Sequence, residues 1–206
     1  MLNVFARPSV SKVIAPLGVR LAHAGVTPDA ITAVGTLGAV GGALGLLGTG
    51  RLLAGTFVIW FFVMLDVLDG AVARARGESS RFGAVLDSTM DRVADAAIFA
   101  ALAWWFSRGG DSERIVVAAL LCLVLGAVTS YIKARAEGLG MTCNVGFAER
   151  AERLIIALVG TGLSGLGIPY VLEIALWFLV LASAITVWQR MAEVRRQSAQ
   201  QTQSAK

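Results

Sequence analysis

Two long stretches of this chain carry no charged side chain. The first runs from Ala30 to Gly50, and the second from Ile115 to Ile132. A helix needs about 20 mostly apolar residues to cross the hydrocarbon core of a bilayer. Only 16% of the 206 residues are charged and the mean hydropathy is +0.72, whereas about 25% of the residues in a soluble domain are charged. The sequence therefore predicts an all-α integral membrane protein.

Hydropathy divides the chain into one membrane domain and a tail. About six transmembrane helices are expected between residues 29 and 190, at 29–48, 53–75, 82–107, 114–136, 152–168 and 170–190. Ahead of them, residues 3–22 have one apolar side with Lys12 and Arg20 at its edge, a pattern typical of an amphipathic interfacial helix. A single membrane domain is expected over 1–197, with a disordered Gln/Ser-rich tail at 198–206.

The basic residues predict the orientation of the spans. With six spans and the N-terminus inside, only Arg51, Arg108 and Arg114 of the 18 lysines and arginines fall on the exterior side. Cytoplasmic loops of membrane proteins are enriched in basic residues. We therefore expect a multi-pass protein of the cell membrane, with both termini on the cytoplasmic side.

Two pairs of aspartates interrupt the apolar pattern where the second segment ends and the third begins. Asp66 and Asp69 lie about 60° apart around a helix, and Asp87 and Asp91 about 40° apart. The connection 75–82 is short, so the two helices are neighbours and the pairs can converge. Carboxylates in a membrane segment are costly and mark function. The active site is then expected on the cytoplasmic side.

Four converging carboxylates repel one another, and divalent cations would remove that repulsion. Ligands that are all oxygen suit hard ions, so Mg²⁺ or Mn²⁺ fits better than zinc or copper. Gly70, Ala73 and Gly83 leave room for a bulky ligand, and Arg74 is placed to pair with a phosphate or an acidic neighbour. Helix-end salt bridges or a cation pathway would also use paired acids, but neither explains these small residues and the arginine at fixed offsets.

The run from Asp66 to Asp91 resembles the CDP-alcohol phosphotransferase signature D-x₂-D-G-x₂-A-R-x₈-G-x₃-D-x₃-D at every specified position. The resemblance implies a site for two metal ions with Asp66, Asp69 and Asp87 as ligands. Asp91 would complete this site and act as the general base on the acceptor hydroxyl. The resemblance also implies a homodimer and a CDP-diacylglycerol site lined by Asp29, Ala30, Ile31, Thr32, Asp66, Asp69, Gly70, Ala73, Arg74, Ser80 and Gly83.

Cations at the interior ends of later segments indicate the acceptor. They would surround the mouth of the acid cluster, which favours an anionic acceptor such as a phosphorylated alcohol. The orientation rule and anionic lipids also account for interior cations. The residues expected to bind the acceptor phosphate are Ser130, Lys133, Arg153 and Arg195.

The runs 130–137 and 148–154 are similar to actinobacterial phosphatidylinositol phosphate synthases within that family. This resemblance implies 1D-myo-inositol 3-phosphate as acceptor, with phosphatidylinositol phosphate and CMP as products. Phosphatidylglycerophosphate synthesis from glycerol 3-phosphate is the alternative. A cation transporter is more remote, because the acids crowd at the interior ends of the spans and no symmetric pair of broken helices is seen. No nucleic-acid partner is expected.

Overall fold

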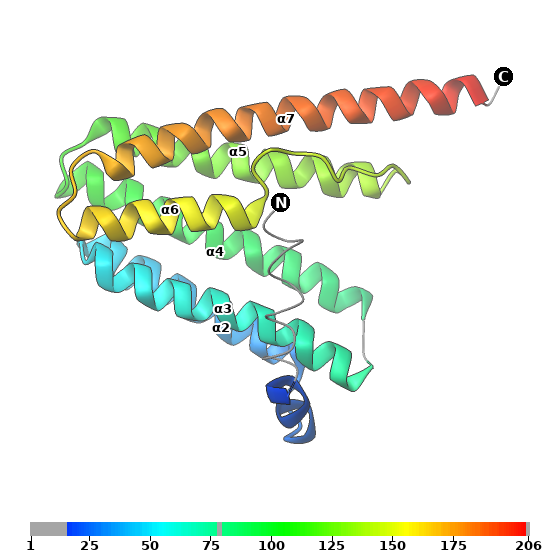
Figure 1. Ribbon diagram of the computed structural model, residues 1–206, viewed down its shortest axis with the longest axis horizontal. Helices are drawn as coiled ribbons and strands as arrows, with labels where there is room; N and C mark the ends of the chain where they lie inside the picture. Colours follow the sequence, from blue (N-terminus) through cyan, green and yellow to red (C-terminus); the bar gives the residue numbers. More distant parts are fainter. Residues whose placement is uncertain (1–15, 78–79, 205–206) are drawn as a thin grey trace. The chain divides into compact units, whose positions relative to one another are not determined.

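The computed structural model describes residues 16–77 and 80–204, apart from the side chains at 66, 67 and 201–204. Every regular element within these ranges is helical (Figure 1). A short helix covers residues 16–23. The elements that follow it are α2 (Pro28–Gly45), the 3₁₀ turn η1 (Leu47–Thr49), α3 (Leu52–Arg76), α4 (Arg81–Arg108), α5 (Glu113–Glu137), α6 (Arg150–Gly165) and α7 (Val171–Ser204).

The all-α prediction is confirmed, and each of the six predicted segments coincides with one helix. Four of the described helices are long and apolar enough to cross a membrane: Pro28–Thr49, Leu52–Arg76, Glu113–Glu137 and Val171–Gln200. Of the other two, α4 carries the charged residues of the motif, and α6 has only 16 residues. The count of six spans stays a prediction.

The two ends of the predicted domain differ in outcome. Residues 3–15 of the expected interfacial helix lie outside the described residues, whereas 16–23 are helical. Disorder was expected from 198 onward, but α7 continues to Ser204. Alanine, glutamine and arginine are good helix formers, so a polar, low-complexity composition need not interrupt a helix that is already nucleated in an apolar span.

The chain divides into two compact units, the first ending at Ala101 and the second beginning at Leu102. In the first unit α2 packs along α3 (Figure 1). A side chain at Gly38 would overlap the ring of Phe62, and one at Gly42 would overlap Val58. These two glycines therefore allow the close approach of helices that small residues permit in membrane proteins.

In the second unit α7 packs against both α5 and α6. Its inward face is apolar, and Leu172, Leu176 and Leu179 are fully or almost fully buried. The segment 138–149 connects α5 to α6 and is tied to α7 by hydrogen bonds at three points along its length. The single membrane domain expected over 1–197 remains a prediction from the sequence.

Candidate active site

A hydrogen bond between α2 and α3 orients one of the motif's aspartates. The hydroxyl of Thr32, which is 5% exposed, donates to Oδ2 of Asp69 at 2.6 Å. A hydroxyl donor to a carboxylate makes a strong, charge-assisted bond. Two residues that the sequence assigned to the donor site, 37 positions apart, are thereby brought into contact.

The start of α4 collects three more of the predicted donor-site residues. Ser80 caps the helix, because its Oγ accepts from the backbone N–H of Gly83 at 2.7 Å. A Cβ at Gly83 would lie 2.9 Å from Ser80 Oγ and 3.3 Å from Asp29 Oδ1. The carboxylate of Asp29 and the hydroxyl of Ser80 therefore meet at a position where only glycine fits without displacing them.

The rest of the predicted donor site spreads over α2 and α3. Arg74 is exposed, and its Nη1 would lie 3.4 Å from a Cβ at Gly70, so its side chain folds back over that glycine. Ala73 is half-buried and Ala30 is exposed. Ile31, at 9% exposure, belongs to the core. Arg74 thus lies over the small-residue face of α3, as the spacing of the motif requires.

The four aspartates of the motif are carried by α3 and α4. Asp69, Asp87 and Asp91 are each half-buried, and the side chain of Asp66 lies outside the described part of the chain. Among the side chains that are described, no three acids, histidines or cysteines form a group that could hold a metal ion. As a donor set, half-buried carboxylate oxygens fit a hard divalent ion. Convergence of all four acids remains a prediction.

A further acid, the third on α4, was missed from the sequence. Asp95 is 8% exposed, and Arg92 Nη2 lies 3.7 Å from Oδ2 of both Asp91 and Asp95. The available signal was spacing, because Asp95 follows Asp91 at the same four-residue interval that separates Asp87 from Asp91. Arg92 therefore holds the predicted general base against a second, buried carboxylate.

In the second unit, two buried arginines converge on one threonine. Arg153 is 4% exposed and Arg190 is 6% exposed. Arg153 Nη1 donates to the hydroxyl of Thr129 at 3.3 Å, and Arg190 Nη1 donates to the Thr129 carbonyl at 2.5 Å. Ser130 is the next residue along α5. Two desolvated guanidiniums so close together favour an anion between or beside them.

Two glycines lie close to this arginine pair. A Cβ at Gly126 would lie 3.6 Å from Arg153 Nη2, so the guanidinium lies against the α5 backbone. Gly146 has a φ of 152°, and a Cβ at this position would lie 2.7 Å from Thr186 Cγ2. The connecting segment therefore packs tightly against α7 here. Burial raises the pKa of the Cys143 thiol on this segment, and the positive charge of Arg190 opposes that rise. Cys143 is therefore a packing residue.

Two of the other predicted acceptor residues have different surroundings. Lys133 forms an ion pair with Glu137 at 3.9 Å along α5. Arg195 is exposed, and its five-residue separation from Arg190 turns it about 140° around α7. Arg190 is the first charged residue after the uncharged run that follows Glu173. No other local feature of the sequence separates Arg190 from Arg195.

Comparison with known proteins places this arrangement in a family. The CDP-alcohol phosphatidyltransferase model matches residues 25–188, most of the chain and both units. This chain belongs to the CDP-alcohol phosphatidyltransferase family. The match includes every position of the aspartate motif and the buried Arg153.

Relatives within the family share one name. The phosphatidylinositol phosphate synthase of Mycobacteroides abscessus is 49% identical over 196 residues, which cover 95% of this chain and 89% of that protein. The synthase of Mycolicibacterium smegmatis is 48% identical over 200 residues, covering 95% and 90% respectively. Identity at this level over nearly the whole length identifies the chain as a family enzyme of the phosphatidylinositol phosphate synthase type.

Solved structures of the family agree with the fold. The Mycobacterium tuberculosis phosphatidylinositol phosphate synthase with CDP-DAG bound has a TM-score of 0.85 at 47% identity, covering 89% of this chain and 94% of that one. The same enzyme in complex with manganese and citrate has a TM-score of 0.84 at 48% identity, covering 88% of each chain. The CDP-alcohol phosphatidyltransferase fold therefore extends over nearly all of the described residues.

Proposed function

We propose that this enzyme transfers the phosphatidyl group of CDP-diacylglycerol to 1D-myo-inositol 3-phosphate, releasing phosphatidylinositol phosphate and CMP. The observation that best supports a phosphorylated acceptor is the pair of buried guanidiniums of Arg153 and Arg190 at Thr129. Guanidinium groups match the oxygens of a phosphate in geometry and charge. A phosphorylated acceptor carries such a phosphate, whereas an uncharged alcohol does not.

On the donor side, the residues of α2, α3 and the start of α4 would hold the CDP-lipid. Arg74 would pair with a phosphate of the donor. Asp29 and Ser80, which meet at Gly83, would contact its cytidine end. Divalent ions, Mg²⁺ or Mn²⁺ and two in number, would be held by Asp66, Asp69, Asp87 and Asp91, and would offset the negative charge of the diphosphate when bound. Thr32 would keep Asp69 oriented for that role.

Asp91 would act on the acceptor. Its carboxylate would accept the proton of the inositol hydroxyl as that oxygen attacks the phosphorus bearing the diacylglycerol. The bond from this phosphorus to the oxygen of the cytidine phosphate then breaks, and CMP leaves. Arg92, 3.7 Å from the Asp91 carboxylate, would restrict the directions in which Asp91 can point.

An acceptor panel tests the proposal. Purified enzyme would be supplied with CDP-diacylglycerol, Mg²⁺ and one of inositol phosphate, glycerol 3-phosphate, free inositol or serine, and CMP release would be measured. We expect release with inositol phosphate and at most a few per cent of that rate with the uncharged or zwitterionic acceptors. If CMP is released only with glycerol 3-phosphate, that compound replaces inositol phosphate as the proposed acceptor. If CMP is released with none of the four compounds, the acceptor is not a phosphorylated polyol of this kind.

Exchanging arginine for lysine on α7 tests the acceptor site. Arg190→Lys keeps the charge but loses the planar fork, so the KM for inositol phosphate should rise roughly 10- to 100-fold. The matched variant Arg195→Lys, on the exposed face, should change that KM less than about twofold. Steady-state kinetics at saturating CDP-diacylglycerol measures both. Equal effects of the two variants would return Arg195, Ser130 and Lys133 to consideration as primary phosphate contacts.

The membrane arrangement forms part of the same proposal. Six spans, a location in the cell membrane and a cytoplasmic active site with both termini inside are supported by the distribution of basic residues. Lipid contact is supported by the exposed aromatic and aliphatic side chains of the long helices. A homodimer is proposed from the family resemblance alone.

A further inference from the structure

The segment 138–149 is hydrogen-bonded along the polar end of α7. At its end, the N–H of Ala148 donates to Thr186 Oγ1 at 3.0 Å. In its middle, Arg190 Nε donates to the Val145 carbonyl at 3.0 Å. Near its start, Thr142 pairs with the side chain of Gln197, about two turns of α7 beyond Arg190. These hydrogen bonds hold the segment that leads directly into α6 and Arg153.

The pairing between Gln197 and Thr142 is made by two bonds. The Thr142 N–H donates to Gln197 Oε1 at 3.0 Å, and Gln197 Nε2 donates to the Thr142 carbonyl at 2.7 Å. The side-chain amide thus satisfies both polar groups of one peptide residue, as a neighbouring strand would. Truncation of the Gln197 side chain would break both bonds, and loss of its N–H₂ group alone would break the bond to the Thr142 carbonyl.

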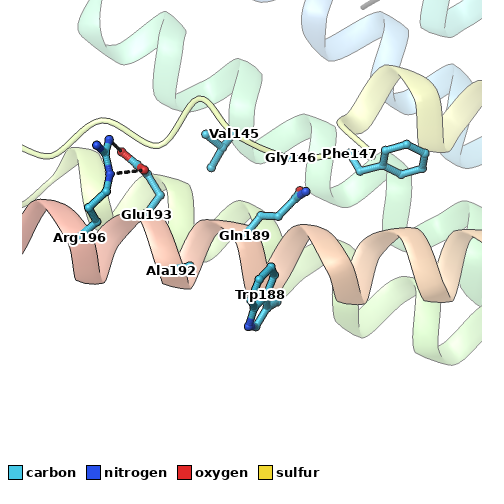
Figure 2. Close-up of a pocket in the computed structure, with 8 residues that line it drawn as sticks. All are labelled: Val145, Gly146, Phe147, Trp188, Gln189, Ala192, Glu193 and Arg196. Atoms are coloured by element: carbon cyan, nitrogen blue, oxygen red, sulfur yellow. Dashed lines mark hydrogen bonds and ion pairs between the residues drawn. The ribbon is translucent and has the colours of Figure 1, made fainter.

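The amide of Gln197 is itself oriented by neighbours on α7. Its Nε2 lies 2.6 Å from Glu193 Oε1, and the same carboxylate receives Arg196 Nη2 at 2.7 Å. Figure 2 shows this Glu193–Arg196 ion pair on the side of α7 along which Val145 and the connecting segment pass. With two acceptors for its Nε2 group and a backbone donor for its oxygen, the amide has only one favourable orientation.

The segment connects Thr142 to the arginine pair over a short distance in the chain. Val145 binds Arg190, and the Ala148 carbonyl accepts from Arg153 Nη1 at 3.4 Å. Both arginines therefore use carbonyls of this segment as partners. A shift of the segment at Thr142 would change where both guanidiniums point.

We propose that Gln197 is a positioning residue for the acceptor site: by pinning Thr142 to the polar end of α7, it sets the segment whose carbonyls orient Arg153 and Arg190. The proposal rests on the proposed function, since it takes these arginines to bind the acceptor phosphate. It also gives a role to the part of α7 that lies beyond the predicted span.

The expected effect is selective and of moderate size. Met141 and Cys143 pack with Ala136 in a small buried cluster, with Val194 of α7 against it. The segment therefore stays near α7 when the amide pairing is lost, and the enzyme folds. Loss of two hydrogen bonds should then raise the KM for the acceptor roughly five- to tenfold, while kcat and the KM for CDP-diacylglycerol change less than about twofold.

Gln197→Glu is the test variant, because it keeps the size of the side chain but replaces the donor with a second acidic oxygen facing Glu193. Gln197→Ala removes the pairing without adding charge. Ala199→Glu, at an exposed position of the same helix, is the matched control for the added charge. Each full-length enzyme would be assayed in Mg²⁺ with CDP-diacylglycerol and inositol phosphate, and hydrogen exchange would be followed in peptides covering 138–149.

A raised acceptor KM in both Gln197 variants but not in Ala199→Glu, with faster exchange at Thr142, supports the proposal. The proposal is overturned by an unchanged acceptor KM or by an equal rise of that KM in the control. It is also overturned if kcat falls and the KM values for both substrates rise together. Failure of both Gln197 variants to fold also overturns it, because the residue is then structural. A wild-type enzyme that is inactive with inositol phosphate instead contradicts the proposed function, so the two failures are distinguishable.

Discussion

Asp91→Asn is expected to lower kcat about 10²- to 10⁴-fold, the range attributed to a positioned general base. Asparagine has the shape of aspartate but cannot accept the proton of the acceptor hydroxyl. Binding of CDP-diacylglycerol should remain within a few-fold of wild type, because the three aspartates proposed as the main metal ligands, Asp66, Asp69 and Asp87, are unchanged. Single-turnover CMP release and equilibrium binding of the donor measure the two effects separately.

The neighbouring Asp95 provides the control for this experiment. It lies one turn further along α4 and shares Arg92 with Asp91, so Asp95→Asn disturbs the same ion pair without touching the motif. We expect Asp95→Asn to retain most of its turnover. Near-normal turnover in Asp91→Asn would remove Asp91 from the base role, and an equal loss in both variants would assign the effect to the position of Arg92.

Asp69→Asn is expected to abolish metal-dependent donor binding. A neutral amide is a poorer ligand for a hard cation than a carboxylate, so the affinity for Mn²⁺ should fall roughly 100-fold or more. The amide oxygen can still accept the Thr32 hydroxyl, so the contact between α2 and α3 survives. Titration of the purified enzyme with Mn²⁺, followed by the ion's paramagnetic resonance, gives this affinity without any turnover.

Thr32→Val tests the same metal site with a milder change than Asp69→Asn. Valine has nearly the shape of threonine but cannot donate to Asp69, whose bond from Thr32 is 2.6 Å. Loss of an orienting partner of a metal ligand costs about 10- to 100-fold in metal affinity, so Thr32→Val should fall between wild type and Asp69→Asn. Unchanged Mn²⁺ affinity in Asp69→Asn would exclude Asp69 as a ligand and leave it a structural partner of Thr32.

On the donor side, local geometry orders several of the residues chosen from the sequence. Asp69, Gly70 and Arg74 lie within two turns of one helix, so helical geometry alone orders them along α3. Asp29 and Ser80, chosen from the opening of the first span and from the motif region, both lie beside Gly83. Asp95 could have been added from its spacing, because it continues the same face of α4.

On the acceptor side, α7 shows what helical spacing alone does not reveal. Arg190, Arg195 and Gln197 stand in one polar stretch after an apolar run, and nothing local distinguishes them. Arg195 was preferred from the sequence, yet Arg190 is the residue that reaches Thr129. Gln197 was assigned to the end of the domain, yet its side chain forms hydrogen bonds with Thr142, which lies 55 positions away in the chain.

Hydropathy and helical spacing are local properties, so the amino-acid sequence is enough to predict a helical, apolar chain with an aspartate motif. Which face of α7 is buried, which cations meet and which segment they hold could be seen only in the folded protein. Those outcomes depend on how helices distant in the chain rotate to bury their apolar faces. That rotation is set by the packing of all their side chains together.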